Sequence, residues 1–514
     1  MKTAMLLFCF VWASQFLSAQ DLSYRKDFTT IPSFRHQTVL REGAFPVVST
    51  PEVPLCLRLP GDTSRPHRYR NHYGDLLQDD PLYNPKYPAW IPAVRVVAAN
   101  GFTWLVDRYV LQADFSRIGP KTWKNNLKYG WEWDADRFGV NFIGHPYSGN
   151  NYFNIARANG YSYWQSLPFA VEGSLMWEYF GENTRPSYND LINTPISGMF
   201  LGEVLYRLSS NILDDRTRGG ERVLREVLSG LLSPARALNR LTQGKSFRVT
   251  STEVYQKEPL NITLFAGLHK VNTNNKFGSG QTNEILNLQL DYGNPFEQRP
   301  RKPFDVFRLR IDLSYGAGRK ILDNVTGYGL LFGKNARAGD QGLLLGGFQH
   351  YDYWDNMIFE MGTLGFGAGV ISRLPVARHS NLFSSVHLAV VPLAGNSTRY
   401  GPDTSQYRDY NFGGGLEGKI DETFNINQWA SVGLLGFYYW IHTYNGTPGN
   451  SLVGILKPRL TIRLHKNLSI GMEHHIYYND RYLNGVANLH LVRTEQKVFL
   501  QLFLEDPNRK GNYH

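Results

Sequence analysis

The chain has 514 residues, a formal net charge of +10 and an aromatic content of 14%, which allows several soluble domains or one large barrel with an extension. One of its two cysteines, Cys9, lies in the N-terminal apolar segment, so a fold held together by intramolecular disulfides is excluded. The basic residues are scattered among aromatic ones, which argues against a nucleic-acid partner and suits an anionic membrane surface better.

The first twenty residues have the pattern of a secretory signal. Lys2 gives a positive start, residues 4–13 form an unbroken apolar run, and Ser18 and Ala19 are small residues suited to cleavage. The run is too short for a membrane-spanning helix, which needs roughly 20 apolar residues. We therefore expect export and removal of residues 1–20. Residues 21–90 are polar and interrupted by prolines, which predicts an extended periplasmic segment.

Residues 91–243 predict a helical domain. The apolar spacing fits helices over residues 91–113, 160–180, 195–213 and 220–241. Kinks are expected at Pro168 and Pro234, and Thr194 and Pro195 have the pattern of a helix start. None of these segments has the roughly 18 uninterrupted apolar residues of a spanning helix, so we expect them to form a plug inside or beneath a barrel. The basic, amphipathic segment 220–241 could instead rest on the inner leaflet of the outer membrane.

A long motif lies within this helical domain. It comprises Asp136-Arg137-Phe138 with Asn141, then residues 144–153, 156–160, 173–178 and 186–190. Over residues 134–207 the chain resembles a domain-of-unknown-function family of bacterial envelope proteins, found in Bacteroidetes-like and proteobacterial genomes. The resemblance implies an envelope location and implies no activity, cofactor or substrate.

The same stretch concentrates polar residues among apolar neighbours, where each needs a partner or a purpose. A catalytic interpretation makes His145 a base or metal ligand with carboxylate partners. The residues so assigned are His145, Glu172, Glu178 and Asp190 as catalytic groups, and Arg157, Asn150, Asn193 and Glu203 as ligand-binding groups. The favoured alternative is a hydrogen-bonded network that anchors the plug. The sequence has no standard metal-ligand spacing and no glycine-rich phosphate loop, so neither a metal nor a cofactor is expected.

Residues 244–505 predict a transmembrane antiparallel β-barrel. In residues 307–315 every odd position is apolar and every even one is polar, and similar segments recur between polar turns. About twelve to fourteen such segments have nearly the length that crosses a bilayer as a tilted strand. Arg308, Arg310, Arg459 and Arg463 should then face a wet lumen. A soluble β-sandwich or lipocalin-like barrel is the alternative, and residues 506–514 form a polar tail.

Together these features predict a mainly β protein of the outer membrane, in which a helical plug-like domain precedes the barrel. The expected function is passage or binding of a small or lipidic ligand, gated by the internal helical segment, with outer-membrane lipid as a further partner. The alternative is a barrel-embedded enzyme that acts on lipid or envelope glycan through His145 and the neighbouring carboxylates. Protein partners are not indicated by the sequence.

Overall fold

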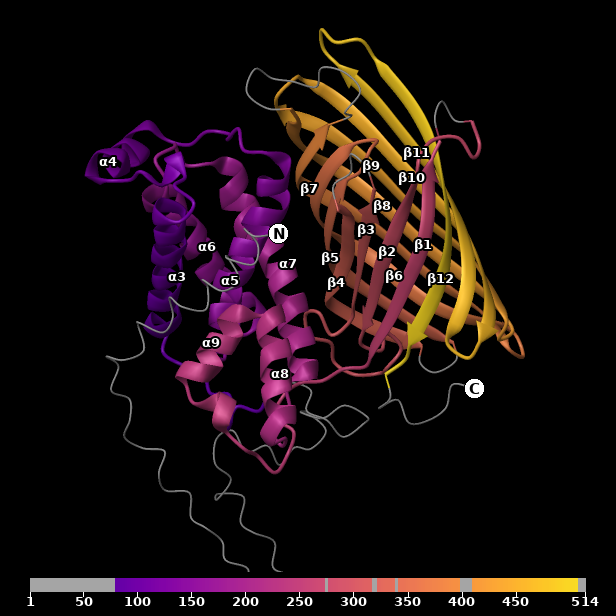
Figure 1. Ribbon diagram of the computed structural model, residues 1–514, viewed down its shortest axis with the longest axis horizontal. Coiled ribbons are helices and arrows are strands. Elements are labelled where there is room, and N and C mark those ends of the chain that lie inside the picture. The colour runs from indigo at the N-terminus through magenta and orange to yellow at the C-terminus, as the bar shows by residue number, and fades with distance from the viewer. Residues whose placement is uncertain (1–78, 273–275, 317–320, 338–340, 398–408, 507–514) are drawn as a thin grey trace, which may run out of the picture.

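The computed structural model describes residues 79–272, 276–316, 321–337, 341–397 and 409–506. The expected signal peptide, most of the expected periplasmic segment and nearly all of the polar tail lie outside these residues. The described chain consists of helices followed by a β-barrel (Figure 1).

Twelve antiparallel strands close into one barrel, in which each strand pairs with its sequence neighbours and β1 pairs with β12. The predicted fold class is thereby confirmed, at the lower end of the expected strand number. Closure leaves no unpaired sheet edge. The strands are β1 Leu260–Val271, β2 Thr282–Tyr292, β3 Phe307–Tyr315, β4 Leu322–Arg337, β5 Gly342–Asp355, β6 Glu360–Ala377, β7 Ser380–Ser397, β8 Asn411–Ile426, β9 Ala430–Asn445, β10 Gly449–His465, β11 Leu468–Leu483 and β12 Leu489–Leu504.

Alternation along the strands gives the barrel two different faces. On β10, Leu460, Ile462 and Leu464 are exposed on the outside, whereas Arg459 and Arg463 line a pocket in the lumen, as predicted. The barrel also has two distinct ends. We call the end at which β1 begins and β12 finishes the terminal end, because Ile262 pairs with Leu504 there, and the opposite end the loop end.

The helical domain comprises seven α-helices and several short helical segments within residues 90–247. Local sequence explains where several of them start. Ser162 caps α6 through a reciprocal capping box with Gln165, and Pro234 starts α9 directly after α8, where a kink was expected. The α-helices are α3 Trp90–Tyr109, α4 Pro120–Tyr129, α5 His145–Ala158, α6 Tyr163–Met176, α7 Tyr188–Ile212, α8 Gly219–Leu232 and α9 Pro234–Thr242.

Helix α7 begins earlier than the sequence suggested. Its N-cap is Ser187, whose hydroxyl accepts a hydrogen bond from the Asp190 backbone N–H, so Pro195 lies inside the helix instead of at its first turn. A proline in a helix removes one backbone donor, yet tertiary packing outweighs that loss here because most of α7 is buried. Among the described residues, no helix is long and apolar enough to cross a membrane.

The helical domain lies beside the barrel, against its outer wall (Figure 1). On β5, Gln349 accepts a hydrogen bond from Tyr163 of α6, and Tyr351 stacks on Phe200 of α7 with ring centroids 5.7 Å apart. His350, between them in sequence, points the other way and bonds to Glu417 in the lumen. The prediction that the helices plug the inside of the barrel is therefore corrected. Apolar periodicity shows that a helix is buried, but it cannot tell which face of a sheet covers it.

Close backbone contact joins α5 and α7. A Cβ atom added to Gly149 would lie 1.7 Å from the Thr194 carbonyl oxygen, and one added to Gly198 would lie 2.5 Å from the Gly149 Cα. The small residues noted in the sequence thus allow two helices to approach closely. This packing fixes the position of α5 against α7, and both helices carry residues of the first candidate site.

Candidate functional site

Two segments of π-helix position the polar cluster of the helical domain. The first, η3 Val140–Gly144, runs directly into α5, so His145 stands at the junction; the second, η4 Trp177–Gly181, contains Glu178. Such π-helical insertions are uncommon and are found frequently at functional sites. We call His145, Asp134, Asp136, Glu178 and Asp190 the His145 cluster.

The structure brings His145 and Asp190 together, as the catalytic interpretation required. The His145 Nε2 atom lies 3.3 Å from a carboxylate oxygen of Asp190 and 4.0 Å from one of Asp136. Its Nδ1 atom lies 3.1 Å from the hydroxyl oxygen of Thr194. Asp190 is buried, whereas more than half of the Asp136 side chain is exposed. The cluster therefore has a buried side and a side open to solvent.

Electrostatics decide the protonation state of His145. Burial disfavours the charged imidazole, but the negative charge of Asp190, a hydrogen bond with Asp136 and the charge of Glu178 outweigh it and raise the pKa of His145 to about 10. The imidazole consequently carries a proton at neutral pH. This favours a proton donor or a cationic partner over the base that the sequence suggested.

Glu178 is almost completely buried and accepts a 2.6 Å hydrogen bond from the Ser187 backbone N–H. Burial raises the pKa of Glu178 to about 7, while the nearby charge of His145 acts in the opposite direction. A carboxyl with such a pKa can exchange a proton near neutral pH. The cluster thus combines one protonated imidazole with one carboxyl that titrates in the physiological range.

Asp134, Asp136 and His145 also place potential metal-ligand atoms within 4.8 Å of one another. The sequence did not predict this group because Asp134, Asp136 and His145 do not form a standard metal-ligand motif. A cation would have to displace the proton of His145, since only the neutral imidazole is a ligand. The geometry allows a metal, and the raised pKa of His145 opposes it.

Glu172, expected to belong to the same site, lies elsewhere. It is half-buried on α6, and burial raises its pKa, but none of its hydrogen bonds or ion pairs reaches the His145 cluster within the described part of the chain. Six positions separate Glu172 from Glu178. Because side chains share a helix face only when they are three or four positions apart, or a multiple of about 3.6, these two point in different directions. The structure brings together three of the four predicted catalytic residues.

The four predicted ligand-binding residues make structural contacts and do not gather in one site, although Arg157 and Glu203 also line one pocket. Glu203 is fully buried and pairs with Arg157 at 2.7 Å and with Arg207 at 2.9 Å. Asn150 accepts a hydrogen bond from Asn154 on the same helix. Asn193 donates to the Asn141 carbonyl and so connects α7 to η3. These contacts match the favoured alternative of an anchoring network, although the network anchors helices to one another and to the barrel wall.

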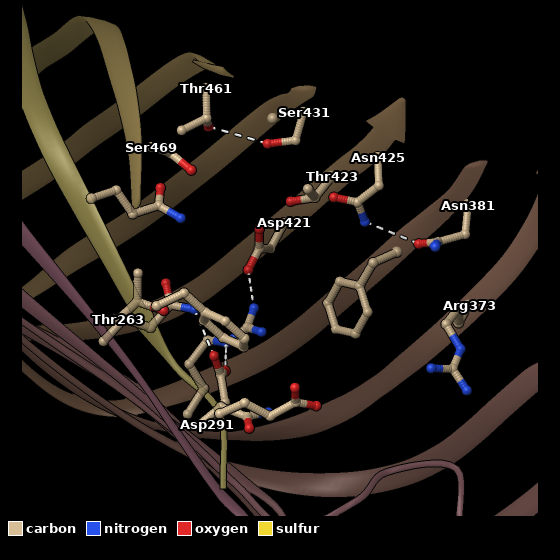
Figure 2. Close-up of a pocket in the computed structure, with 18 of the residues that line it drawn as sticks. Thr263, Asp291, Arg373, Asn381, Asp421, Thr423, Asn425, Ser431, Thr461 and Ser469 are labelled. Atoms are coloured by element: carbon tan, nitrogen blue, oxygen red, sulfur yellow. Dashed lines mark hydrogen bonds and ion pairs between the residues drawn. The ribbon is translucent and has the colours of Figure 1, made fainter. Parts of the chain in front are cut away.

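A second candidate site, which the sequence did not locate, is a pocket of about 820 Å³ in the barrel lumen. We call it the lumen pocket. Residues of the turns at the terminal end, among them Asn294, Trp429 and Asn467, contribute to its rim. Hydroxyl and amide side chains line its wall in bonded pairs, Ser431 with Thr461 and Asn425 with Asn381 (Figure 2).

A charged clamp forms the inner limit of the lumen pocket. Arg308 and Arg310 of β3 both donate to Asp421 of β8, on another part of the barrel wall. Arg308 also bonds to Asp291 of the adjacent β2. Alternation predicted that both arginines face the lumen, but pairing between strands that are far apart in the sheet depends on how the barrel closes. That is why the sequence could not identify Asp421 as their partner.

Beyond the clamp, side chains from different parts of the wall meet across the lumen. Lys457 of β10 and Lys497 of β12 lie 3.8 and 3.9 Å from Asp312 of β3. Towards the loop end, Tyr439 of β9 donates to Asp352 of β5 at 2.8 Å. The rings of Trp354 and Phe437 pack edge to face nearby. The lumen is thus open at the terminal end and filled by the barrel's own side chains towards the loop end.

Part of the helical domain matches a protein-family model. Residues 130–235 match the family described as Domain of unknown function (DUF3943). This confirms the resemblance seen in residues 134–207 to a family of unknown function. No curated protein sequence matches the chain.

Solved structures resemble the barrel only distantly. The outer membrane channel DcaP of Acinetobacter baumannii is 7% identical with a TM-score of 0.24, and the alignment covers 48% of this chain and 96% of that one. The NanC porin is 10% identical with a TM-score of 0.27, covering 47% and 98%. OmpT of Vibrio cholerae is 8% identical with a TM-score of 0.23, covering 48% and 96%. Likeness at this level carries no argument about what the present barrel binds or conducts.

Proposed function

We propose that this protein is an outer-membrane barrel that binds a small polar ligand in its lumen pocket and does not let solutes diffuse freely through. The observation that carries the proposal is the position of the clamp. Arg308, Arg310 and Asp421 close the inner side of a pocket of about 820 Å³ that is open at the terminal end. Pockets of this volume hold small molecules.

The membrane location is supported by the surface of the barrel. The outside of β10 and β11 exposes an apolar row that includes Leu460, Ile462, Leu464, Ile470 and Met472, as expected of strands that face lipid. Barrels of the outer membrane have short turns on the periplasmic side. The turns at residues 378–379, 427–429 and 466–467 lie at the terminal end, so we assign that end, and the mouth of the lumen pocket, to the periplasm.

The lining of the lumen pocket indicates the chemistry of its ligand. Six basic side chains line the pocket, compared with three acidic ones, those of Asp291, Asp421 and Glu505. Amide and hydroxyl groups make up much of the remaining polar wall. Guanidinium groups suit carboxylate or phosphate, and amides and hydroxyls suit hydroxyl groups. The ligand class that fits is a hydroxyl-rich molecule with a negative charge.

Calorimetry on the detergent-solubilised protein tests this assignment, with glucuronate as the anionic probe and glucose as its uncharged counterpart. Arg463 lines the pocket and has no ion-pair partner among the described residues, so Arg463→Gln should weaken glucuronate binding without affecting folding. Arg218→Gln, an exposed arginine of the helical domain, is the matched control. Equal affinity for both sugars, or an unchanged affinity in Arg463→Gln, would contradict the proposal.

The His145 cluster supports a second candidate function, proton-transfer chemistry on envelope lipid or glycan. The contact between His145 and Asp190, together with the solvent-exposed Asp136, is the observation that favours it. Such a site would belong to the helical domain and not to the barrel interior. If it is catalytic, His145→Gln abolishes turnover of an envelope lipid or glycan fraction while Glu172→Gln leaves it intact. Equal effects of the two changes would refute this function.

A further inference from the structure

A second pocket, of about 340 Å³, lies where the helical domain meets the terminal end of the barrel. We call it the seam pocket. Residues of α5, α6, α7 and α9, the 3₁₀ segment η5 Lys245–Phe247 and the β2–β3 connection line it. Seven basic side chains line this pocket, and the only carboxylates in the lining are Asp79 and Glu203.

The four arginines of the seam pocket each have a carboxylate within ion-pair distance, whereas Lys245 has none in the described part of the chain. Lys245 is 7% exposed. Its ammonium lies over the Tyr87 ring, 5.6 Å from the ring centroid. Arg236 is 3% exposed and donates to neutral acceptors, the Tyr206 carbonyl and the Ser210 hydroxyl, with Asp79 at 3.8 Å.

The consequence is an excess of buried positive charge. Burial, together with the charges of Arg248 and Arg240, lowers the pKa of Lys245 to about 7. Lys302, on the barrel side of the pocket, has its pKa lowered to about 8, first by burial. An isolated cation in such surroundings is costly, so it is retained where a purpose offsets the cost. An anion in the pocket would offset this cost for Lys245.

The surroundings of the seam pocket are apolar and exposed. Trp164, which lines it, is 51% exposed, and Phe247, two residues after Lys245, is 77% exposed. Helix α8 bonds to this region through Arg222, which donates to the Lys245 carbonyl. Its exposed side carries Leu224, Val227, Leu228 and Leu231 at helical spacing. A cationic pocket bordered by exposed apolar surface suits a molecule with an anionic head and an apolar body.

We propose that the seam pocket binds the phosphate ester of a glycerophospholipid, with Lys245 and Arg236 contacting the phosphate and the acyl chains lying on the exposed apolar surface. Lys302 belongs to the connection at the terminal end, which faces the periplasm in the orientation given above. The lipid therefore comes from the inner leaflet of the outer membrane. The seam pocket is separate from the lumen pocket, so an experiment can contradict ligand binding at one pocket without contradicting it at the other.

Calorimetry tests the seam pocket with three probes: short-chain phosphatidylglycerol below its micelle concentration, glycerol 3-phosphate and inorganic phosphate. Lys245→Met removes one charge-assisted contact and should weaken phosphatidylglycerol binding roughly tenfold or more. Lys124→Met, on the exposed surface of α4, is the matched control and should bind as the wild type does. Equal binding by Lys245→Met and wild type would overturn the proposal. Glycerol 3-phosphate binding as tightly as the lipid would also overturn it, in favour of a soluble phosphate ester.

A measurement on the unaltered chain covers the case in which Lys245→Met does not fold. Acetic anhydride modifies accessible neutral lysines, so the extent of acetylation of Lys245 and Lys124 is compared by mass spectrometry with and without phosphatidylglycerol. The proposal predicts that the lipid protects Lys245 and leaves Lys124 unchanged. Equal acetylation of Lys245 in both samples would overturn it.

Discussion

Glu203→Gln perturbs the ion-pair network that connects the helical domain to the barrel. The Glu203 carboxylate is fully buried and accepts from Arg157 at 2.7 and 2.9 Å and from Arg207 at 2.9 Å. Arg207 in turn pairs at 3.0 Å with Asp305 of the β2–β3 connection. The substitution keeps the side-chain shape but removes the negative charge, so the buried guanidinium group of Arg157 loses its carboxylate partner and that of Arg207 keeps only Asp305.

The size of the effect follows from the burial of all the partners. The side chains of Arg157 and Arg207 are 16% and 6% exposed, and removing one partner of a buried ion pair costs about 3–5 kcal/mol. At 1.4 kcal/mol for each factor of ten, this corresponds to a roughly 100- to 4000-fold larger equilibrium constant for local opening of α7. The matched control, Glu221→Gln, breaks an exposed pair with Arg225 at the same i,i+4 spacing, which costs about 0.3–0.5 kcal/mol.

Hydrogen exchange of the α7 amides, followed by mass spectrometry on the detergent-solubilised protein, measures this opening directly. We expect much faster exchange in Glu203→Gln, little change in Glu221→Gln, and no change in the barrel strands of either variant. If α7 in Glu203→Gln exchanged within a factor of two of the wild type, the inference that this network anchors the helices would be refuted.

Three further predictions concern charge and packing in the helical domain. The folded pKa of Lys245 is about 7 against 10.5 for the free side chain, so the unfolded state binds more protons between these values, and Lys245 contributes a rise in stability of at most about 1.4 kcal/mol per pH unit there. Lys245→Met should lower the slope of stability against pH in this window by up to that amount, as measured by thermal melts of the helical signal, and an unchanged slope would exclude the contribution of Lys245. The pKa of His145 is raised from 6.5 to about 10, so the contribution of His145 to stability is fully present below pH 6.5 and is lost as the pH rises to 10. His145→Gln should therefore reduce the fall in stability between pH 6.5 and 10. An unaltered dependence of stability on pH in this variant would disprove the positive charge assigned to His145. Gly149→Ala should destabilise the α5–α7 contact by at least about 1–3 kcal/mol because the new Cβ would meet the Thr194 backbone, whereas Gly101→Ala in α3, which meets nothing within 4 Å, should be neutral or stabilising in the same melts. Equal melting shifts for the two alanine variants would count against the close approach of the helices.

The barrel could be predicted from the sequence because its signal is local. Alternation of the kind seen at Leu460, Ile462 and Leu464 depends only on the two-residue period of a strand, and the structure places these residues outside and Arg459 and Arg463 inside. The predicted number of strands, about twelve to fourteen, was close to the observed twelve for the same reason. Local periodicity is preserved whatever the strands pair with.

The position of the helices could not be predicted in this way. The apolar surface of α7 is equally compatible with a lumen and with an outer wall, and the decisive contact, Phe200 on Tyr351, joins residues far apart in the sequence. The candidate sites show the same limit. His145 and Asp190 were found because their motif lies in one short stretch, whereas the pairing of Arg308 with Asp421 depends on barrel closure. Glu172 was grouped with them by proximity in sequence, although its side chain points elsewhere.

Single-channel conductance in planar bilayers tests the central claim, that the lumen binds a ligand and is closed beyond the clamp, most directly. The ion pairs from Asp312 to Lys457 and Lys497, and the contact of Tyr439 with Asp352, fill the lumen towards the loop end. We predict that the purified wild-type protein inserts without producing stable conductance steps, and that added glucuronate does not change this. Stable open-pore steps from the wild-type protein, blocked by glucuronate, would show a conducting channel and contradict the account.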